Sequence, residues 1–338
     1  MDEEGFRKFI RSGKTSSRSR GPSASTVQSY ISAVKEFEGF LSRSRKGKKL
    51  ADADGSDADR FVRHLMDEKR VNHDRLMGLF RYAKFTRNDD VYVSILTTLF
   101  LDQLTSLCGS FAEAYGREMQ DDVLGGFEPP PIGTPARSMP RATNDFMRRL
   151  ESGIGEKETR DFLLEHCPDV SPQERYSDER ALYLASKDID DYLRRQRAKF
   201  IEELEEYERD GTLYYNQRID REVIDFVRDN PGIGAGVRRG NLIYHTKIPY
   251  MAIEYLRDKD PKMKRYHYCH CPLARESILS GEAISRNLCH CSAGYCKRPY
   301  EIAFGTRLRA DVKKSVLWGD PICQFAIEIP EELVPGKR

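Results

Sequence analysis

The sequence contains no apolar run that approaches the roughly 20 residues that a membrane-spanning helix requires. Its first residues, MDEEGFRKFIRSGK, are acidic and then basic and lack a long apolar core, so we expect no secretory signal. A strong excess of one charge is also missing, because 56 basic and 54 acidic residues leave a formal net charge of +2. The charge of the whole chain therefore favours neither nucleic acid nor acidic partners. We expect a soluble, cytoplasmic protein without a membrane partner.

Cysteine is present in an uneven distribution. Six of the eight cysteines lie close together near the C-terminus, at positions 269, 271, 289, 291, 296 and 323. Because we expect a reducing compartment, a disulfide framework is disfavoured, and the clustered thiols point to another use. Cys108 and Cys167 stand alone in helical surroundings, where we expect small buried hydrophobic residues.

Two C-x-C units, Cys269-His-Cys271 and Cys289-His-Cys291, carry the strongest chemical signal. In extended backbone, side chains two residues apart point the same way. Each unit then directs two thiols to one side and its histidine to the other. Together they place four sulfurs around one point, as zinc or an iron–sulfur centre requires. We predict Cys269, Cys271, Cys289 and Cys291 as metal ligands, with Cys323 as a further ligand at the start of the last strand.

The identity of the metal stays open, because the spacing is not that of the familiar C-x₂-C zinc knuckle. Zinc and an iron–sulfur cluster are the two candidates for the cofactor. Redox-active cysteines and buried free thiols are the alternative interpretations. Cys296 ranks below Cys323 as a ligand. We expect the neighbouring polar side chains to orient the ligands from behind, and these are His267, His270, His290 and Glu301.

The sequence does not decide between a structural and a catalytic site. Four thiolates around zinc leave no open position, which favours a structural role. Three ligands and a water would permit hydrolysis. Glu276, Lys297 and Glu301 are the nearby candidates for proton transfer, although each is also a typical surface residue of a helix.

The proline- and glycine-rich segment Gly125–Pro140 predicts an interdomain linker, because its five prolines forbid a helix. It separates residues 1–124 from residues 141–338. The first part shows four amphipathic helical patterns, and Ser25 with Gln28 and Ser56 with Asp59 are the predicted start signals. No periodic repeat is present.

The second part begins with a helical region that includes a long helix over Leu182–Tyr207. Gly232–Gly236 predicts a plain turn before a strand at Leu242–His245. A hairpin follows, with Trp318-Gly-Asp320 as its turn and alternate apolar residues from Cys323 to Ile329 on one strand face. The expected fold class is α+β, with an N-terminal all-α bundle, a helical middle region and a small C-terminal α/β cysteine-rich domain.

About the last hundred residues contain a set of short motifs, which are Thr246-Lys-Ile-Pro249, Cys269-His-Cys-Pro272, Ala274-Arg-Glu-Ser-Ile278, Cys289, Cys291-Ser-Ala-Gly294, Tyr300-Glu301, Phe304-Gly305, Ser315-Val-Leu317, Gly319-Asp320, Cys323 and Phe325. By these motifs the segment resembles an uncharacterised prokaryotic family. That family is related to the L-2-amino-thiazoline-4-carboxylic acid hydrolase-like proteins and, more distantly, to 4-vinyl-reductase-type domains. The resemblance implies a small α/β domain with a metal or a small-molecule ligand, and it does not by itself establish hydrolase chemistry.

The helix pattern from Ser25-Thr-Val-Gln-Ser-Tyr30 to Leu41, and then from Phe61 to Leu65, resembles the SAM-like core-binding domain of tyrosine recombinases. In that family the domain clamps DNA. The recombinase catalytic half needs a His-x-x-Arg box, which is missing from the last two hundred residues, so we do not expect an active recombinase.

Residues 1–50 carry twelve basic and five acidic side chains, a local net charge of +7. Such a patch can neutralise DNA phosphates, and a solvated basic tail on a protein-interaction module is the alternative. The predicted DNA contacts follow the first helix pattern and are Arg43, Arg45, Lys46, Lys48 and Lys49.

The function predicted from the sequence is that of a cytoplasmic metal-binding sensor or regulator with a DNA-binding helical module. A metal-dependent hydrolase of a small heterocycle or amide is the first alternative. A protein-interaction module with a structural zinc is the second.

Overall fold

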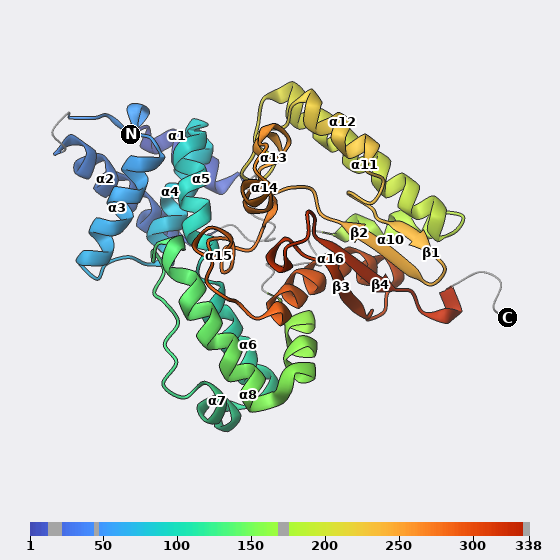
Figure 1. The fold of residues 1–338 in the computed structure, drawn as a ribbon. Coiled ribbons are helices and arrows are strands. Elements are labelled where there is room, and N and C mark those ends of the chain that lie inside the picture. Colours follow the sequence, from blue (N-terminus) through green and yellow to red (C-terminus); the bar gives the residue numbers. More distant parts are fainter. Residues whose placement is uncertain (13–21, 44–46, 168–175, 334–338) are drawn as a thin grey trace. The chain divides into compact units, whose positions relative to one another are not determined.

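The computed structural model describes residues 1–12, 22–43, 47–167 and 176–333. Contacts within the chain divide it into two compact units (Figure 1). The first unit comprises residues 1–102 and 130–136, and the second comprises residues 103–129 and 137–338. The expected α+β fold class is confirmed, because the first unit is helical and the second combines helices with one small sheet.

The first unit is a helical bundle. Each of its helices begins after a residue whose side-chain oxygen accepts a backbone N–H, as is typical of N-caps. A short 3₁₀ turn, η1 (Leu50–Asp52), precedes the third helix. The helices are α1 (Glu3–Arg11), α2 (Ala24–Ser42), α3 (Gly55–Asp67), α4 (His73–Thr86) and α5 (Asp89–Phe100).

The predicted starts of α2 and α3 are wrong by two residues. Ser23 caps α2 in place of Ser25, and the capping box of α3 is formed by Asp54 with Asp57. Several small polar residues precede each apolar run, so the cap signal fixes a helix start only to within about two positions. Helix α1 was missing from the prediction, although Phe6 and Ile10 are fully buried.

Helices α2 and α4 approach each other closely at Gly78. A Cβ atom at this position would lie 2.8 Å from the Cα atom of Tyr30, so no larger residue fits without a shift of the backbone. Around this contact the core is aromatic, with the rings of Phe37 and Phe61 5.1 Å apart. Close packing of this kind stabilises the bundle.

The second unit contains the remaining helices and the sheet. Its long helix α8 is kinked at Gly155, where φ is 81°. The α-helices are α6 (Gln103–Tyr115), α7 (Arg117–Leu124), α8 (Met139–Glu165), α10 (Ser177–Leu184), α11 (Ile189–Asp210), α12 (Arg221–Asp229), α13 (Ala252–Arg257), α14 (Pro261–Tyr268), α15 (Ser277–Ser280) and α16 (Cys289–Phe304). The 3₁₀ turns are η2 (Ala136–Ser138), η3 (Arg286–Leu288), η4 (Val316–Trp318) and η5 (Glu331–Leu333).

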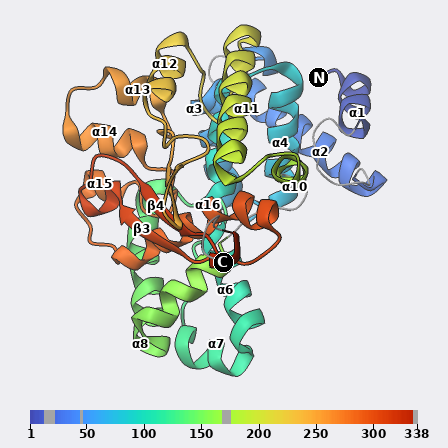
Figure 2. The same cartoon turned by 90° about the vertical axis from the view of Figure 1, so that its right-hand side faces the viewer.

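The sheet has four antiparallel strands in the order β1-β2-β4-β3. Its strands are β1 (Val237–Arg239), β2 (Leu242–Thr246), β3 (Ala310–Lys314) and β4 (Gln324–Glu328). The predicted strand at 242–245 and the predicted C-terminal hairpin are therefore confirmed. Helix α16 packs against β3 and β4 (Figures 1 and 2) and buries Tyr300 together with Ile243, Phe325 and Ile327.

Two boundaries differ from those expected. The unit boundary lies at Asp102 rather than at Gly125, because Phe111 of α6 packs its ring 5.4 Å from that of Phe162 in α8. The expected helix over 182–207 is two helices, since Asp188 accepts a hydrogen bond from the Asp191 N–H and starts α11 anew. The first difference comes from a long-range contact, whereas the second comes from a local cap signal that the prediction overlooked.

One stretch, Asp89–Tyr115, is by length and composition apolar enough to cross a membrane, and 33% of its most apolar window is buried. It is interrupted at Leu101 and Asp102, between α5 and α6. Ile95 belongs to the core of the first unit, and Leu107 is fully buried in the second. The apolar residues of this stretch are thus divided between two cores.

Candidate metal centre

All eight cysteines belong to the second unit and are free thiols. Cys269 and Cys271 follow the end of α14, Cys289 is the first residue of α16, and Cys323 directly precedes β4. The backbone at Cys269 is extended, as expected for the first C-x-C unit. These four cysteines, from three segments of the chain, are called the thiol quartet below.

The thiols of the quartet lie near one another. Burial raises the pKa of all four, and in each of the six pairs the charge of one thiolate raises the pKa of the other further. Without a ligand such thiols stay protonated, and a metal that binds them must displace their protons. A bound cation offsets the mutual repulsion between the thiolates.

Every sulfur of the quartet also receives a hydrogen bond. Cys269 accepts the backbone N–H of Cys271, and Cys271 accepts those of Leu273 and Ala274. The Ser315 hydroxyl lies 3.1 Å from the sulfur of Cys289 and also contacts that of Cys323. Hydrogen bonds of this kind lower the pKa of a thiol and stabilise its thiolate form. They are also a known means of tuning metal–thiolate and iron–sulfur centres.

The second C-x-C unit is helical, so the expectation of extended backbone is wrong there. Helix α16 starts at Cys289, and two residues along a helix correspond to a rotation of about 200°. The side chains of Cys289 and Cys291 therefore leave the helix in different directions. Burial raises the pKa of Cys291, and the thiolates of Cys167, Cys271 and Cys289 raise it further, in that order of effect. Cys296, two turns after Cys289 and on the same helix face, interacts with Cys323. Cys167, which the sequence placed alone, thus lies beside the cluster.

A lysine accompanies the thiols. The backbone N–H of Lys247, just after β2, donates to the carbonyl of Cys323 at 3.2 Å, because β2 and β4 are paired. Burial raises the pKa of Cys271 and of Cys323, and the Lys247 ammonium lowers both. Within the described residues no carboxylate pairs with Lys247, so its charge is available to a negatively charged thiolate centre.

Among the residues that the structure describes, no three His, Cys, Asp or Glu side chains lie close enough together to hold one metal ion. The quartet is thus not arranged as the ligand set of a single ion in this structure. An iron–sulfur cluster is larger, because its irons are bridged by sulfide, and its cysteines stand correspondingly further apart. The residues fit such a cluster in number and in chemical type.

The histidines expected behind the ligands have other partners. His270 donates from Nε2 to the carbonyl of Ile248 at 2.6 Å, and His290 donates from Nδ1 to that of Asn287 at 3.0 Å. Burial lowers the pKa of both rings, which keeps them neutral. The Nε2 of His267 lies 3.2 Å from the Asp258 carboxylate.

The side chains considered for proton transfer are held in internal contacts. Lys297 is fully buried, and its Nζ donates to Glu165 at 2.6 Å, to Glu301 at 2.7 Å and to the carbonyl of Leu308 at 3.0 Å. Glu276 accepts the Tyr266 hydroxyl at 2.8 Å. These contacts are those of structural residues and do not favour a hydrolytic centre.

The predicted DNA contacts of the first unit divide into three groups. Arg45 and Lys46 lie outside the described residues. Lys48 binds Asp54 and the fully buried Asp57, each at 2.7 Å, and stabilises the start of α3. Arg43 and Lys49 are exposed, and in the described part of the chain neither forms an ion pair.

Comparison with known proteins gives one match. The model of a family of unknown function (DUF6144) matches residues 253–334. The matched segment is about a quarter of the chain and contains the whole quartet, whereas Lys247 and Cys167 lie outside it. Neither the curated proteins nor the solved structures contain a match.

Proposed function

We propose that the second unit binds an iron–sulfur cluster through Cys269, Cys271, Cys289 and Cys323, and that the chain acts as a cytoplasmic regulator. The observation that carries the proposal is the convergence of one buried and three half-buried thiols, each with a hydrogen-bond donor to its sulfur. The ammonium of Lys247, which pairs with no carboxylate of the described residues, adds a positive charge beside this anionic centre. A single zinc ion is the alternative cofactor.

A regulatory role is favoured over hydrolysis by the same geometry. Four thiolate ligands leave no open position on a metal, and Lys297 and Glu276 are engaged elsewhere. A cluster whose state changes with oxygen or redox conditions suits a sensor, because oxidation of exposed or labile sulfur sites is reversible signalling chemistry.

The test is the metal content of protein purified without oxygen. We expect iron and acid-labile sulfide in equal amounts, about one cluster per chain, with visible charge-transfer absorption. Air or a chelator should bleach the colour. Stoichiometric zinc in colourless protein would establish the alternative cofactor, and folded protein without bound metal would contradict both forms of the proposal.

DNA binding by the first unit is the second part of the proposed function. It is supported by the exposed side chains of Arg43 and Lys49, which lack ion pairs in the described residues. We expect the full-length chain to bind duplex DNA weakly, with an affinity that falls steeply as salt rises.

Replacing Arg43 and Lys49 by Gln should reduce the slope of log affinity against log salt by about 1.8, because two phosphate contacts are lost. The matched control replaces Lys157 and Arg307, which are 81% and 89% exposed in the second unit, and should leave the slope unchanged. An equal effect of both double variants would indicate attraction by overall charge and no DNA site on the first unit.

A further inference from the structure

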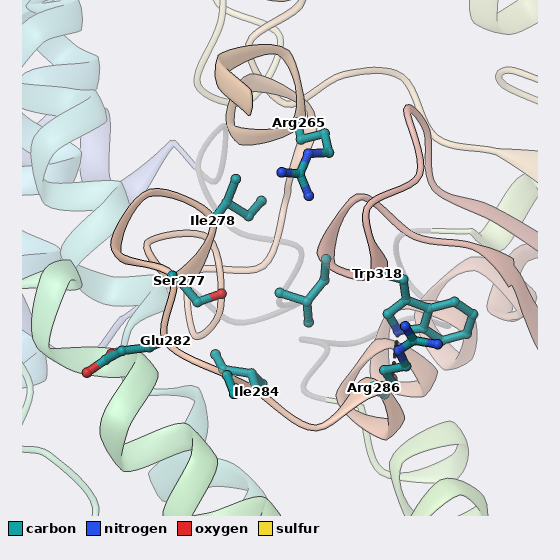
Figure 3. Close-up of a pocket in the computed structure, with 10 residues that line it drawn as sticks. Arg265, Ser277, Ile278, Glu282, Ile284, Arg286 and Trp318 are labelled. Atoms are coloured by element: carbon teal, nitrogen blue, oxygen red, sulfur yellow. Dashed lines mark hydrogen bonds between the residues drawn. The ribbon is translucent and has the colours of Figure 1, made fainter. Parts of the chain in front are cut away.

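A small pocket of about 270 Å³ lies in the second unit (Figure 3). It is open to solvent and lined by residues of α14, α15, the segment that follows α15, η3 and η4. Its volume is close to the lower end of the range found for small-molecule sites. The function proposed above does not involve this pocket. All of its lining residues fall within the segment matched by the family model.

The pocket carries an excess of positive charge. Arg265 and Arg286 line it, and in the described part of the chain neither is paired with a carboxylate. Arg265 is anchored by a hydrogen bond from Nη1 to the carbonyl of Val316 at 3.3 Å. Glu282 is the one acidic residue of the lining, and its carboxylate points away from the space between Arg265 and Trp318 (Figure 3). An anion in this space would meet guanidinium groups and no carboxylate.

The lining also has apolar and flat parts beside the polar Ser277. The indole of Trp318 is fixed by its Nε1–H, which donates to the carbonyl of Arg286 at 3.2 Å. The guanidinium of Arg286 lies over the same ring, 5.8 Å from its centroid. Ile278 and Ile284 face the space from the opposite side (Figure 3). Such a lining favours a compact ligand with an apolar, flat body.

We propose that this pocket binds a small organic acid, a carboxylate on a planar apolar body of the size of benzoate. Arg265 binds the carboxylate, Arg286 adds a second positive charge, and Trp318 contacts the flat face of the ligand. A guanidinium suits this role because its planar fork matches a carboxylate in geometry as well as in charge.

The position of the pocket links it to the thiols. Arg265 lies on α14, which leads directly to Cys269, and Arg286 begins η3, which leads to Cys289. Ser315, whose hydroxyl contacts the sulfurs of Cys289 and Cys323, is the N-cap of η4 and precedes the pocket wall at Leu317 and Trp318. A ligand in the pocket therefore contacts the elements that position the quartet. Binding of the acid itself does not require the cluster.

The test uses the full-length protein and sodium benzoate as the probe. Trp318 is the single tryptophan of the chain, so its fluorescence reports on the pocket alone. We expect a saturable change with benzoate, both before and after treatment with a chelator, and no change with the neutral analogue benzamide. Chelated protein contains no bound metal, so benzoate binding is tested in it independently of the cluster. This test therefore still applies if the cluster proposal is wrong.

Arg265→Gln should weaken benzoate binding at least tenfold, and Arg286→Gln should weaken it severalfold. Arg286 is exposed, so its variant keeps the test valid if the Arg265 variant does not fold. Arg307→Gln, a variant of a residue that is 89% exposed outside the pocket, should bind as the unaltered protein does. Equal binding of benzamide, unchanged affinity in the Arg286 variant, or no saturable response to benzoate would overturn the proposal.

Discussion

Serine in place of Cys323 is expected to remove most of the bound metal, whereas serine in place of Cys291 is expected to leave it bound. The sulfur of Cys323 interacts with those of Cys269, Cys271 and Cys289. Cys291 lies about 200° round α16 from Cys289, and the largest effect of a thiol on its pKa comes from Cys167. A hydroxyl is a poor substitute for a thiolate at a zinc or iron–sulfur centre, because such metals prefer soft sulfur ligands.

The two variants form a matched pair, since each exchanges one half-buried thiol for a hydroxyl in the same unit. Both would be purified without oxygen and analysed for iron, zinc and sulfide. We expect Cys323→Ser, like serine at 269, 271 or 289, to lose at least nine-tenths of the metal. Full metal content in Cys323→Ser together with loss in Cys291→Ser would assign the site to the two C-x-C units instead.

Whether Cys291 or Cys323 is the fourth ligand could not be predicted from the sequence. The period of alternation is two in a strand and 3.6 in a helix, so one C-x-C spacing has opposite meanings in the two conformations. The first C-x-C unit has extended backbone at Cys269, whereas α16 already begins at Cys289. Cys323 was correctly placed before the last strand, but its distance from Cys269 depends on how β4 pairs with β2. That pairing is a long-range contact, which local patterns do not encode.

Local sequence patterns predicted those elements whose structure depends on one short segment of the chain. The turn at 318–320 lies between β3 and β4, and both flanking strands show period-two alternation, so the hairpin followed from the sequence. The boundary between units did not, because it depends on whether α6 packs on α8 or on the first bundle. Cys167 and Lys247 could not be found either, since each reaches the cluster only through the folding of the second unit.

Replacing Lys297 by Ala is expected to destabilise the second unit by about 3–5 kcal/mol, the usual cost of removing one partner from a buried ion pair. The Lys297 side chain is fully buried, and its ammonium has three acceptors, two carboxylates and one carbonyl. Glu301, whose side chain is 11% exposed, would keep its negative charge without this cation. Helix α16 would also lose one of its ties to the end of α8, while the hydrogen bond from Arg298 to the Glu165 carbonyl would remain. Arg298, 3.5 Å from Glu301, compensates only in part.

The measurement is urea unfolding of chelator-treated protein, followed by the fluorescence of Trp318, which reports on the second unit. Chelation removes the contribution of a bound metal to stability. The control is Lys157→Ala, because Lys157 pairs with Asp161 on the surface at 2.8 Å and such pairs contribute less than about 1 kcal/mol. A second variant, Lys297→Met with Glu301→Gln, removes both charges and should recover part of the lost stability, since no uncompensated ion remains buried at this pair. An unchanged unfolding midpoint in Lys297→Ala would show that this network contributes little to the fold, and would return Lys297 to consideration as a residue kept for chemistry.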